Sequence, residues 1–70
     1  MKIKNNLGKI IKESPYKRSY IEKHLGISRN TLSNWVTSKN YPSIPQLLKL
    51  AKLLNVKISE IYILEEDENE

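Results

Sequence analysis

The stretch that decides the fold is residues 21–35, IEKHLGISRNTLSNW. A glycine separates two segments in which apolar residues recur every three or four positions, the spacing that places side chains on one face of a helix. Gly26 tolerates the left-handed conformation that ends a helix, and the hydroxyl of Ser28 can accept from the first N–H groups of the next helix. We therefore predict helices at about 17–25 and 29–37 joined by a tight turn. The residues expected to point inward are Ile21, Leu25, Ile27, Leu32 and Trp35.

Three further helices are predicted on either side of this stretch, at residues 3–13, 44–54 and 58–64. The helix at 44–54 is the most apolar of the five, and Ser43 with Gln46 gives it the pattern of a capping box. No segment alternates apolar and polar residues in the manner of a half-buried strand. The sequence therefore predicts an all-α fold of five short helices around one core. We expect this domain to span 1–64 and to be followed by a disordered acidic tail at 65–70.

The charge of the chain falls into two blocks. All 12 Lys and Arg residues lie in residues 1–64 with only three acidic residues, so that this body has a net charge of +9. Five of the last six residues are acidic. A strongly basic body favours a polyanion as partner, and nucleic acid is the commonest polyanion in a cell. A lysine-rich solubilising surface would have the same composition, so that charge alone leaves both interpretations open.

Several classes of function are excluded by composition. The chain of 70 residues has no cysteine and one histidine, so it can build neither a thiolate zinc site nor a cluster of histidine ligands. No nucleophile, base and orienting group occur at a plausible spacing, and no glycine-rich phosphate loop is present. Residues 61–64 form the longest apolar run, far below the about 20 residues that span a membrane. We expect a cytoplasmic protein that is not an enzyme, has no cofactor and does not associate with membranes.

The helices at 17–25 and 29–37 together form a helix–turn–helix, which leaves the second helix able to enter a major groove of DNA. Here the chain resembles the Cro/cI-type helix–turn–helix family of transcriptional regulators, many of which act in phages and prophages. The resemblance covers about residues 5–62. It rests on the framework of residues 21–35 and continues through NYPS at 40–43, LLxLAxxLxV at 47–56 and ISEIY at 58–62. It implies a compact, lambda-repressor-like fold.

The resemblance implies that base-reading side chains lie early on the helix at 29–37. The chemistry of these positions agrees, because arginine can donate two of its N–H groups to guanine and asparagine can pair with adenine. The matching positions are Arg29, Asn30, Ser33 and Asn34, with Ser33 the lesser candidate. Contacts to phosphate are implied at the start of the preceding helix and in the loop that follows, where side-chain cations and backbone N–H groups would fix the register. The matching residues are Lys17, Arg18, Thr31, Thr37, Lys39 and Asn40.

Three positions depart from the family pattern. Glu22 stands where alanine is usual, and its carboxylate must either tilt outward or pair with Arg18 or Arg29. Val36 replaces a frequent glutamate. Ser38 replaces a frequent glycine, at a position where the left-handed conformation would cost a residue with a side chain about 1 kcal/mol. These departures concern the local geometry and strength of DNA binding rather than the fold.

The sequence thus predicts a double-stranded DNA-binding regulator, and a repressor rather than an activator because the chain is too short for a separate activation or sensor domain. We expect a homodimer, which could form only on DNA, because a two-fold dimer matches a palindromic site. The resemblance implies a dimer surface near the last two helices, with the candidates Val56, Ile58, Ile61, Tyr62 and Leu64. A second interpretation of these five residues is that they only cover the domain's own core. The alternative is an adaptor or anti-repressor on the same scaffold, which would bind another regulator and show little specific DNA binding.

Overall fold

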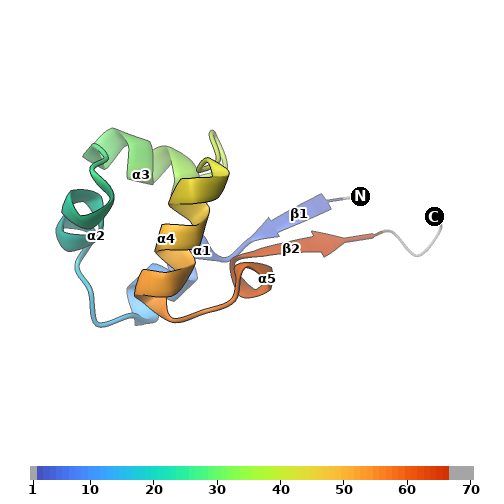
Figure 1. Cartoon of the computed structure of the whole chain (residues 1–70). Coiled ribbons are helices and arrows are strands. Elements are labelled where there is room, and N and C mark those ends of the chain that lie inside the picture. The colour runs from blue at the N-terminus through green and yellow to red at the C-terminus, as the bar shows by residue number, and fades with distance from the viewer. Residues whose placement is uncertain (1, 67–70) are drawn as a thin grey trace.

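The structure is a computed structural model and describes residues 2–66. Five helices form the body, and two short strands pair antiparallel beside it (Figure 1). In chain order the elements are β1 (Lys2–Asn5), α1 (Leu7–Glu13), α2 (Arg18–Leu25), α3 (Arg29–Val36), α4 (Ile44–Leu54), α5 (Ile58–Ile61) and β2 (Tyr62–Glu65). Figure 1 shows the strands extending away from the helices, at the opposite end of the molecule from α2. No helix within residues 2–66 is both long enough and apolar enough to cross a membrane.

One hydrophobic core holds the five helices together, and every helix contributes to it. The predicted inward residues of α2 and α3 all lie in or against this core, which confirms the framework expected from residues 21–35. Partly buried residues such as Ile27, Leu47 and Val56 close its edges. The buried residues are Leu7, Ile11, Ile21, Leu25, Leu32, Trp35, Leu50, Ala51, Leu54 and Ile61.

The end of α2, the beginning of α3 and both ends of α4 lie where the local chemistry predicts. Gly26 takes the left-handed conformation with φ 67° after α2, and Asn55 does the same with φ 56° after α4. The Ser28 hydroxyl oxygen accepts from the N–H of Thr31 at 3.0 Å, which caps α3. Ser43 caps α4 in the same way by accepting from the N–H of Gln46 at 3.4 Å.

The capping box predicted for α4 is only half formed. Its reciprocal half would require the Gln46 carbonyl oxygen, Oε1, to accept from the backbone of Ser43, but Oε1 is buried without a hydrogen-bond partner. The Gln46 amide donates to the Leu25 carbonyl at 3.4 Å. This bond joins the beginning of α4 to the end of α2, so a tertiary contact has replaced the local one.

The prediction of an all-α fold is wrong at both ends of the domain. The helix expected at 3–13 begins at Leu7, and the helix expected at 58–64 ends at Ile61. Residues 2–5 and 62–65 instead form the two strands, in which Ile3 pairs with Leu64 and Asn5 with Tyr62. Glu65, expected in the tail, is the last residue of β2, and the rest of that tail after Glu66 lies outside the described residues.

Asn5 and Asn6 explain why the first helix starts late. The Asn5 carbonyl oxygen Oδ1 accepts from the N–H of Leu7 at 2.9 Å, while its amide donates to the Trp35 carbonyl at 2.8 Å. The backbone N–H of Asn6 donates to the Ile61 carbonyl at 2.8 Å. These bonds tie the chain to α3 and α5 just before α1, and a helix running through the two asparagines would break them.

The residues predicted for a dimer surface are largely used inside this chain. Ile61 is fully buried in the core, so its assignment to an exposed surface is wrong. Val56, Ile58 and Tyr62 are half-buried and pack against the same core. Leu64 differs from them because 56% of it is exposed.

Tyr62 provides a test of this packing, because its hydroxyl is buried without a hydrogen-bond partner. Burial, and secondarily Tyr41, raise the pKa of Tyr62 above the ordinary value of 10.0. The folded protein therefore keeps this proton at a pH where the unfolded chain loses it, and its contribution to stability is lost as the pH rises above about 10. We expect Tyr62→Phe to leave the free energy of unfolding at pH 7 within about 1 kcal/mol of wild type, or to raise it, because the hydroxyl makes no bond.

Urea unfolding at neutral pH and above pH 10 checks this expectation. The alkaline loss of stability should be smaller in Tyr62→Phe than in wild type. Tyr20→Phe is the matched control, since Tyr20 is 49% exposed. A large loss of stability in Tyr62→Phe at neutral pH would show that the hydroxyl does have a partner.

Candidate nucleic-acid interface

The turn between α2 and α3 fixes the crossing of the two helices. After the left-handed Gly26, the N–H of Ile27 donates to the Glu22 carbonyl at 2.9 Å. Ile27 is half-buried against the core, and the capped start of α3 follows at once. Buried residues of both helices then hold them together, with Ile21 and Leu25 from α2 and Leu32 and Trp35 from α3. This is the geometry of a helix–turn–helix.

One face of α3 carries the four predicted base-reading side chains. Arg29 and Asn30 are exposed in the first turn, and Ser33 and Asn34 lie one turn later and are half-buried. Leu32 and Trp35 point the other way, into the core. The structure therefore brings the four polar residues together on the outer surface of a helix that its apolar face holds rigidly.

The predicted phosphate contacts are grouped as expected but are not equally free. The side chains of Lys17, Arg18, Lys39 and Asn40 are all exposed. The backbone N–H groups of Lys39 and Asn40, however, donate to the backbone carbonyl of Asn34 at 2.9 and 3.2 Å. They are therefore not free for phosphate, contrary to what the sequence suggested. After α3, this turn can therefore contact DNA only through its side chains.

The two threonines in this group are already bonded within the chain. The Thr37 hydroxyl donates to the Ser33 carbonyl at 3.1 Å, which leaves it only as an acceptor. Phosphate oxygens also only accept, so Thr37 would have to rotate before it could contact DNA. The Thr31 hydroxyl lies 2.9 Å from the Ser28 hydroxyl, and one of the two donates a hydrogen bond to the other.

Glu22 borders the same hollow as the two arginines of the interface. It lines a hollow of about 610 Å³ between α2 and α3 together with Arg18, Ser19, Arg29 and Ser33. Its carboxylate is the one negative charge in that lining. Arg18 and Arg29 border the same hollow, and the pairing of Glu22 with either of them stays a prediction.

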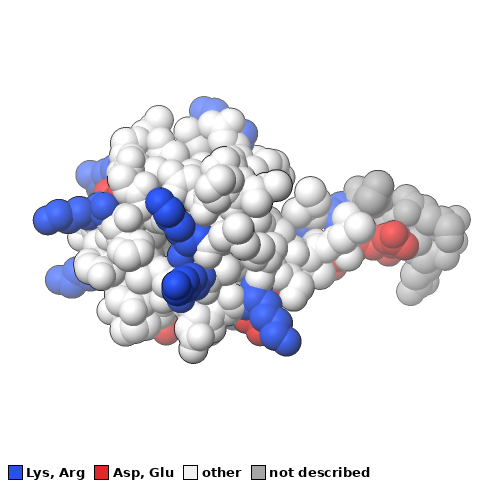
Figure 2. All heavy atoms as spheres, viewed as in Figure 1, with Lys and Arg blue, Asp and Glu red and all other residues white. Residues whose placement is uncertain are grey.

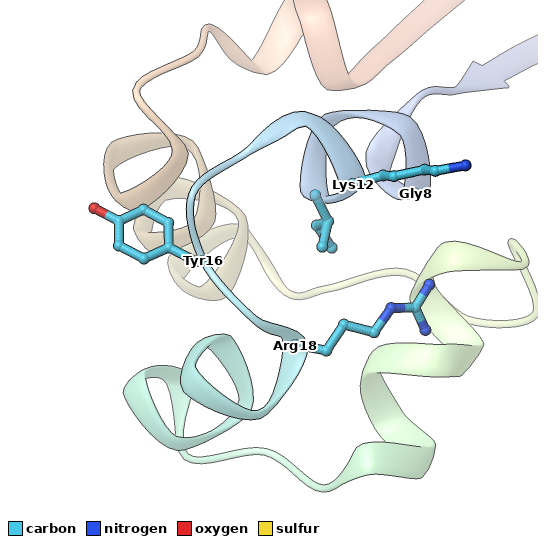
Figure 3. Close-up of a pocket in the computed structure, with 5 residues that line it drawn as sticks. Gly8, Lys12, Tyr16 and Arg18 are labelled. Atoms are coloured by element: carbon cyan, nitrogen blue, oxygen red, sulfur yellow. The ribbon is translucent and has the colours of Figure 1, made fainter.

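Sequence reasoning missed Lys12 as part of this basic surface. Lys12 and Arg18 line a second hollow with Gly8, Ile11 and Tyr16. In Figure 3, Lys12 and Arg18 extend in the same direction while Tyr16 points away from both. Arg18 borders both hollows, so the basic surface continues from α2 onto α1. The sequence feature that could have pointed to Lys12 is its position in the last turn of the first helix, a few residues before α2 begins.

Two departures from the family pattern have structural explanations. Val36, in place of glutamate, packs so closely on α1 that a Cβ added to Gly8 would lie 2.9 Å from its Cγ1 atom. Ser38 has φ 65°, the left-handed conformation predicted to be costly there. Its hydroxyl accepts from the Asn5 amide at 2.8 Å, a bond that helps to hold this turn. The N-terminal residues therefore support the end of α3.

Comparison with known proteins agrees with this geometry. A family model for the Cro/C1-type HTH DNA-binding domain matches residues 6–67. The chain belongs to the Cro/C1-type helix–turn–helix family. Its match begins at Asn6, so β1 lies outside the family pattern while all five helices and β2 lie within it.

A curated relative of this Cro/C1-type domain is known from an archaeon. The chain is 42% identical, over 48 residues, to an uncharacterized HTH-type transcriptional regulator of Methanocaldococcus jannaschii. The aligned part covers 69% of this chain and 73% of the relative. Family and relative together make this chain a DNA-binding regulator of the helix–turn–helix class.

Proposed function

We propose that this protein binds double-stranded DNA sequence-specifically, with α3 in the major groove, and represses transcription by occupying a promoter. The observation that carries the proposal is the single polar face of α3, where Arg29, Asn30, Ser33 and Asn34 lie opposite buried Leu32 and Trp35. Arg29 would donate to guanine O6 and N7, and Asn30 and Asn34 would pair with adenine N6 and N7. Repression needs no further surface, because a bound protein blocks the DNA that the polymerase must enter.

Cations around α3 would hold the phosphate backbone without reading sequence. Arg18 and Lys17 at the start of α2 and Lys39 after α3 are exposed on either side of the polar face. Lys12 extends this group onto α1. Figure 2 shows Lys and Arg side chains projecting from the helical body, with small areas of acidic atoms between them.

Selection from a random duplex library tests the proposal. The purified protein is mixed with the library at low and at moderate salt, and the bound DNA is sequenced. A sharp motif that survives moderate salt is expected, because base contacts depend less on counterion release than phosphate contacts do. A pool without enrichment that dissociates as salt rises would contradict sequence reading.

We also propose that the protein forms a homodimer, through the strands rather than through α5. Ile3 and Leu64 are paired across the two strands. Ile3 is 55% exposed and Leu64 is 56% exposed. Both outer edges of this small sheet have free backbone groups within residues 2–66, and such edges pair readily with another chain. Sedimentation of the protein over a range of concentrations, with and without a palindromic site, tests this proposal. A species that stays monomeric on a palindrome would contradict it.

Lys39→Ala should weaken binding to all duplexes alike. Lys39 is exposed in the turn after α3, and only its side chain is free for phosphate. Losing one phosphate contact reduces the slope of log affinity against log salt by about 1. Titration of a selected and a scrambled duplex at several salt concentrations measures both effects. A loss confined to the selected duplex would instead make Lys39 a base reader.

Glu22→Gln should raise affinity for selected and scrambled duplexes, by about three- to tenfold at low salt. The substitution removes the one carboxylate in the hollow bordered by Arg18 and Arg29 while keeping the shape of the side chain. The gain should shrink as salt is added, because salt screens exposed charges. Glu13→Gln is the matched control on α1. Equal affinities of Glu22→Gln and wild type at low salt would show that this carboxylate does not face the phosphates.

A further inference from the structure

A column of stacked rings follows one side of α2. The ring centroids of Tyr16 and Tyr20 lie 5.2 Å apart with planes 12° apart. Those of Tyr20 and His24 lie 6.0 Å apart with planes 21° apart. Tyr20 and His24 are spaced four apart on α2, so that one lies over the other along the helix, and Tyr16 continues the column from the bend before α2. We term Tyr16, Tyr20 and His24 the aromatic column.

The rings of the aromatic column lie on the opposite side of α2 from Arg18 and Glu22, which border the hollow between α2 and α3. At 3.6 residues per turn, Tyr20 and His24 are about half a turn away from Arg18 and Glu22. Figure 3 shows the same separation for Tyr16, which points away from Lys12 and Arg18. The three rings of the column are therefore not among the side chains proposed to contact DNA.

Two hollows adjoin the aromatic column, and α4 helps to form one of them. One hollow, of about 460 Å³, lies along Tyr16 and Tyr20 and is bordered by Lys17 and Lys23. The other, of about 390 Å³, lies between Tyr16, His24 and α4. From α4 it is lined by Lys49, Lys52 and Leu53. Within residues 2–66, no acidic side chain lines either hollow.

The stacking decides what chemistry this surface favours. Near-parallel rings with centroids 5.2 and 6.0 Å apart are offset, so they cover part of each other's faces and turn their edges and polar atoms outward. The edge is the positive side of the ring quadrupole, so it attracts carboxylates, as do the four lysines. Bases of nucleic acid stack on free ring faces, and an offset column offers them less free face than isolated rings would. Leu53, half-buried between the lysines, adds an apolar contact.

We propose that the aromatic column and its two hollows form a docking site for an acidic segment of a protein partner, with one apolar side chain that contacts Leu53 and the tyrosine rings. Charge complementarity and the outward ring edges carry this assignment. The site goes beyond DNA binding, because Lys17 is the one residue that it shares with the proposed phosphate contacts.

Fluorescence anisotropy with the full chain and no DNA tests the proposal. The probe is a labelled synthetic peptide with three glutamates on each side of one phenylalanine. Wild type should bind it, and Tyr20→Ser and the double variant Lys49→Glu/Lys52→Glu should each bind about tenfold more weakly. Tyr41→Ser is the matched control, because Tyr41 and Tyr20 are 52% and 49% exposed, and it should bind within twofold of wild type. Circular dichroism confirms that each variant is folded.

Arg29→Ala separates this site from the DNA-binding face. The variant should lose base reading and keep its affinity for the peptide. The proposal is overturned if wild type does not bind the probe, if Tyr20→Ser binds as tightly as wild type, or if Arg29→Ala weakens peptide binding as much as Lys49→Glu/Lys52→Glu does. Equal binding of a peptide containing only glutamate would also overturn it, since charge alone would then be enough.

Discussion

Arg29→Ala is expected to abolish the preference for one base pair of the selected site and to cost about 1–3 kcal/mol there. Arg29 is the first residue of α3, directly after the capping Ser28, and its side chain is exposed. Alanine keeps the helix but removes a guanidinium that can bond guanine at two points. The loss corresponds to about fivefold to 150-fold in affinity for the preferred site.

Competition binding with every single-base variant of the selected duplex measures this effect. Wild type should discriminate at that position, and Arg29→Ala should bind all four bases there about equally while keeping its preferences elsewhere. Lys39→Ala serves as the control, because it should lower every affinity without changing any preference. If Arg29→Ala retains the full discrimination of wild type, another side chain reads that base pair.

The helix–turn–helix was predictable because its signals are local. Gly26 as left-handed cap and Ser28 as N-cap act within a few residues of themselves, and the structure confirms both. The spacing of Leu32 and Trp35 defines one buried face of a single helix. Local chemistry of this kind is contained in a short window of sequence, and no distant residue is needed to complete it.

The strands escaped prediction because their partner is remote. Ile3 pairs with Leu64, at the other end of the chain, and the spacing of Ile3 to Leu7 fits a helix equally well. Only the bonds of Asn5 to α3 and of Asn6 to α5 decide between strand and helix. The position of Ile61 depends on the same contacts, so its predicted role as a dimer residue was wrong for the same reason.

The sequence predicted which residues form the candidate site, but it did not predict which of their donor groups are free to bond DNA. The positions of Arg29 and Asn30 follow from the helix face, and the structure leaves both exposed. Whether a donor is free depends on contacts that sequence does not show, such as the Thr37 hydroxyl donating to the Ser33 carbonyl. The stacking of Tyr20 on Tyr16 is another contact that the sequence does not show, since a spacing of four residues allows stacking without requiring it.

Leu32→Ala is expected to destabilise the whole domain by about 2–5 kcal/mol. Leu32 is fully buried, on the inner face of the helix whose outer face holds Arg29. A domain of this size has a total stability of roughly 3–10 kcal/mol, so that the loss is a large part of it. The melting temperature should fall by at least about 10 °C.

Thermal unfolding followed by circular dichroism measures the change, with Ser33→Ala as the control in the next position of α3. Ser33 is half-buried and its change to alanine removes only a hydroxyl, so its variant should melt within a few degrees of wild type. At a temperature where Leu32→Ala is still folded, it should select the same DNA motif as wild type, because Leu32 holds the reading helix in place and does not itself touch a base. A changed motif with unchanged stability would mean that the two faces of α3 are assigned the wrong way round.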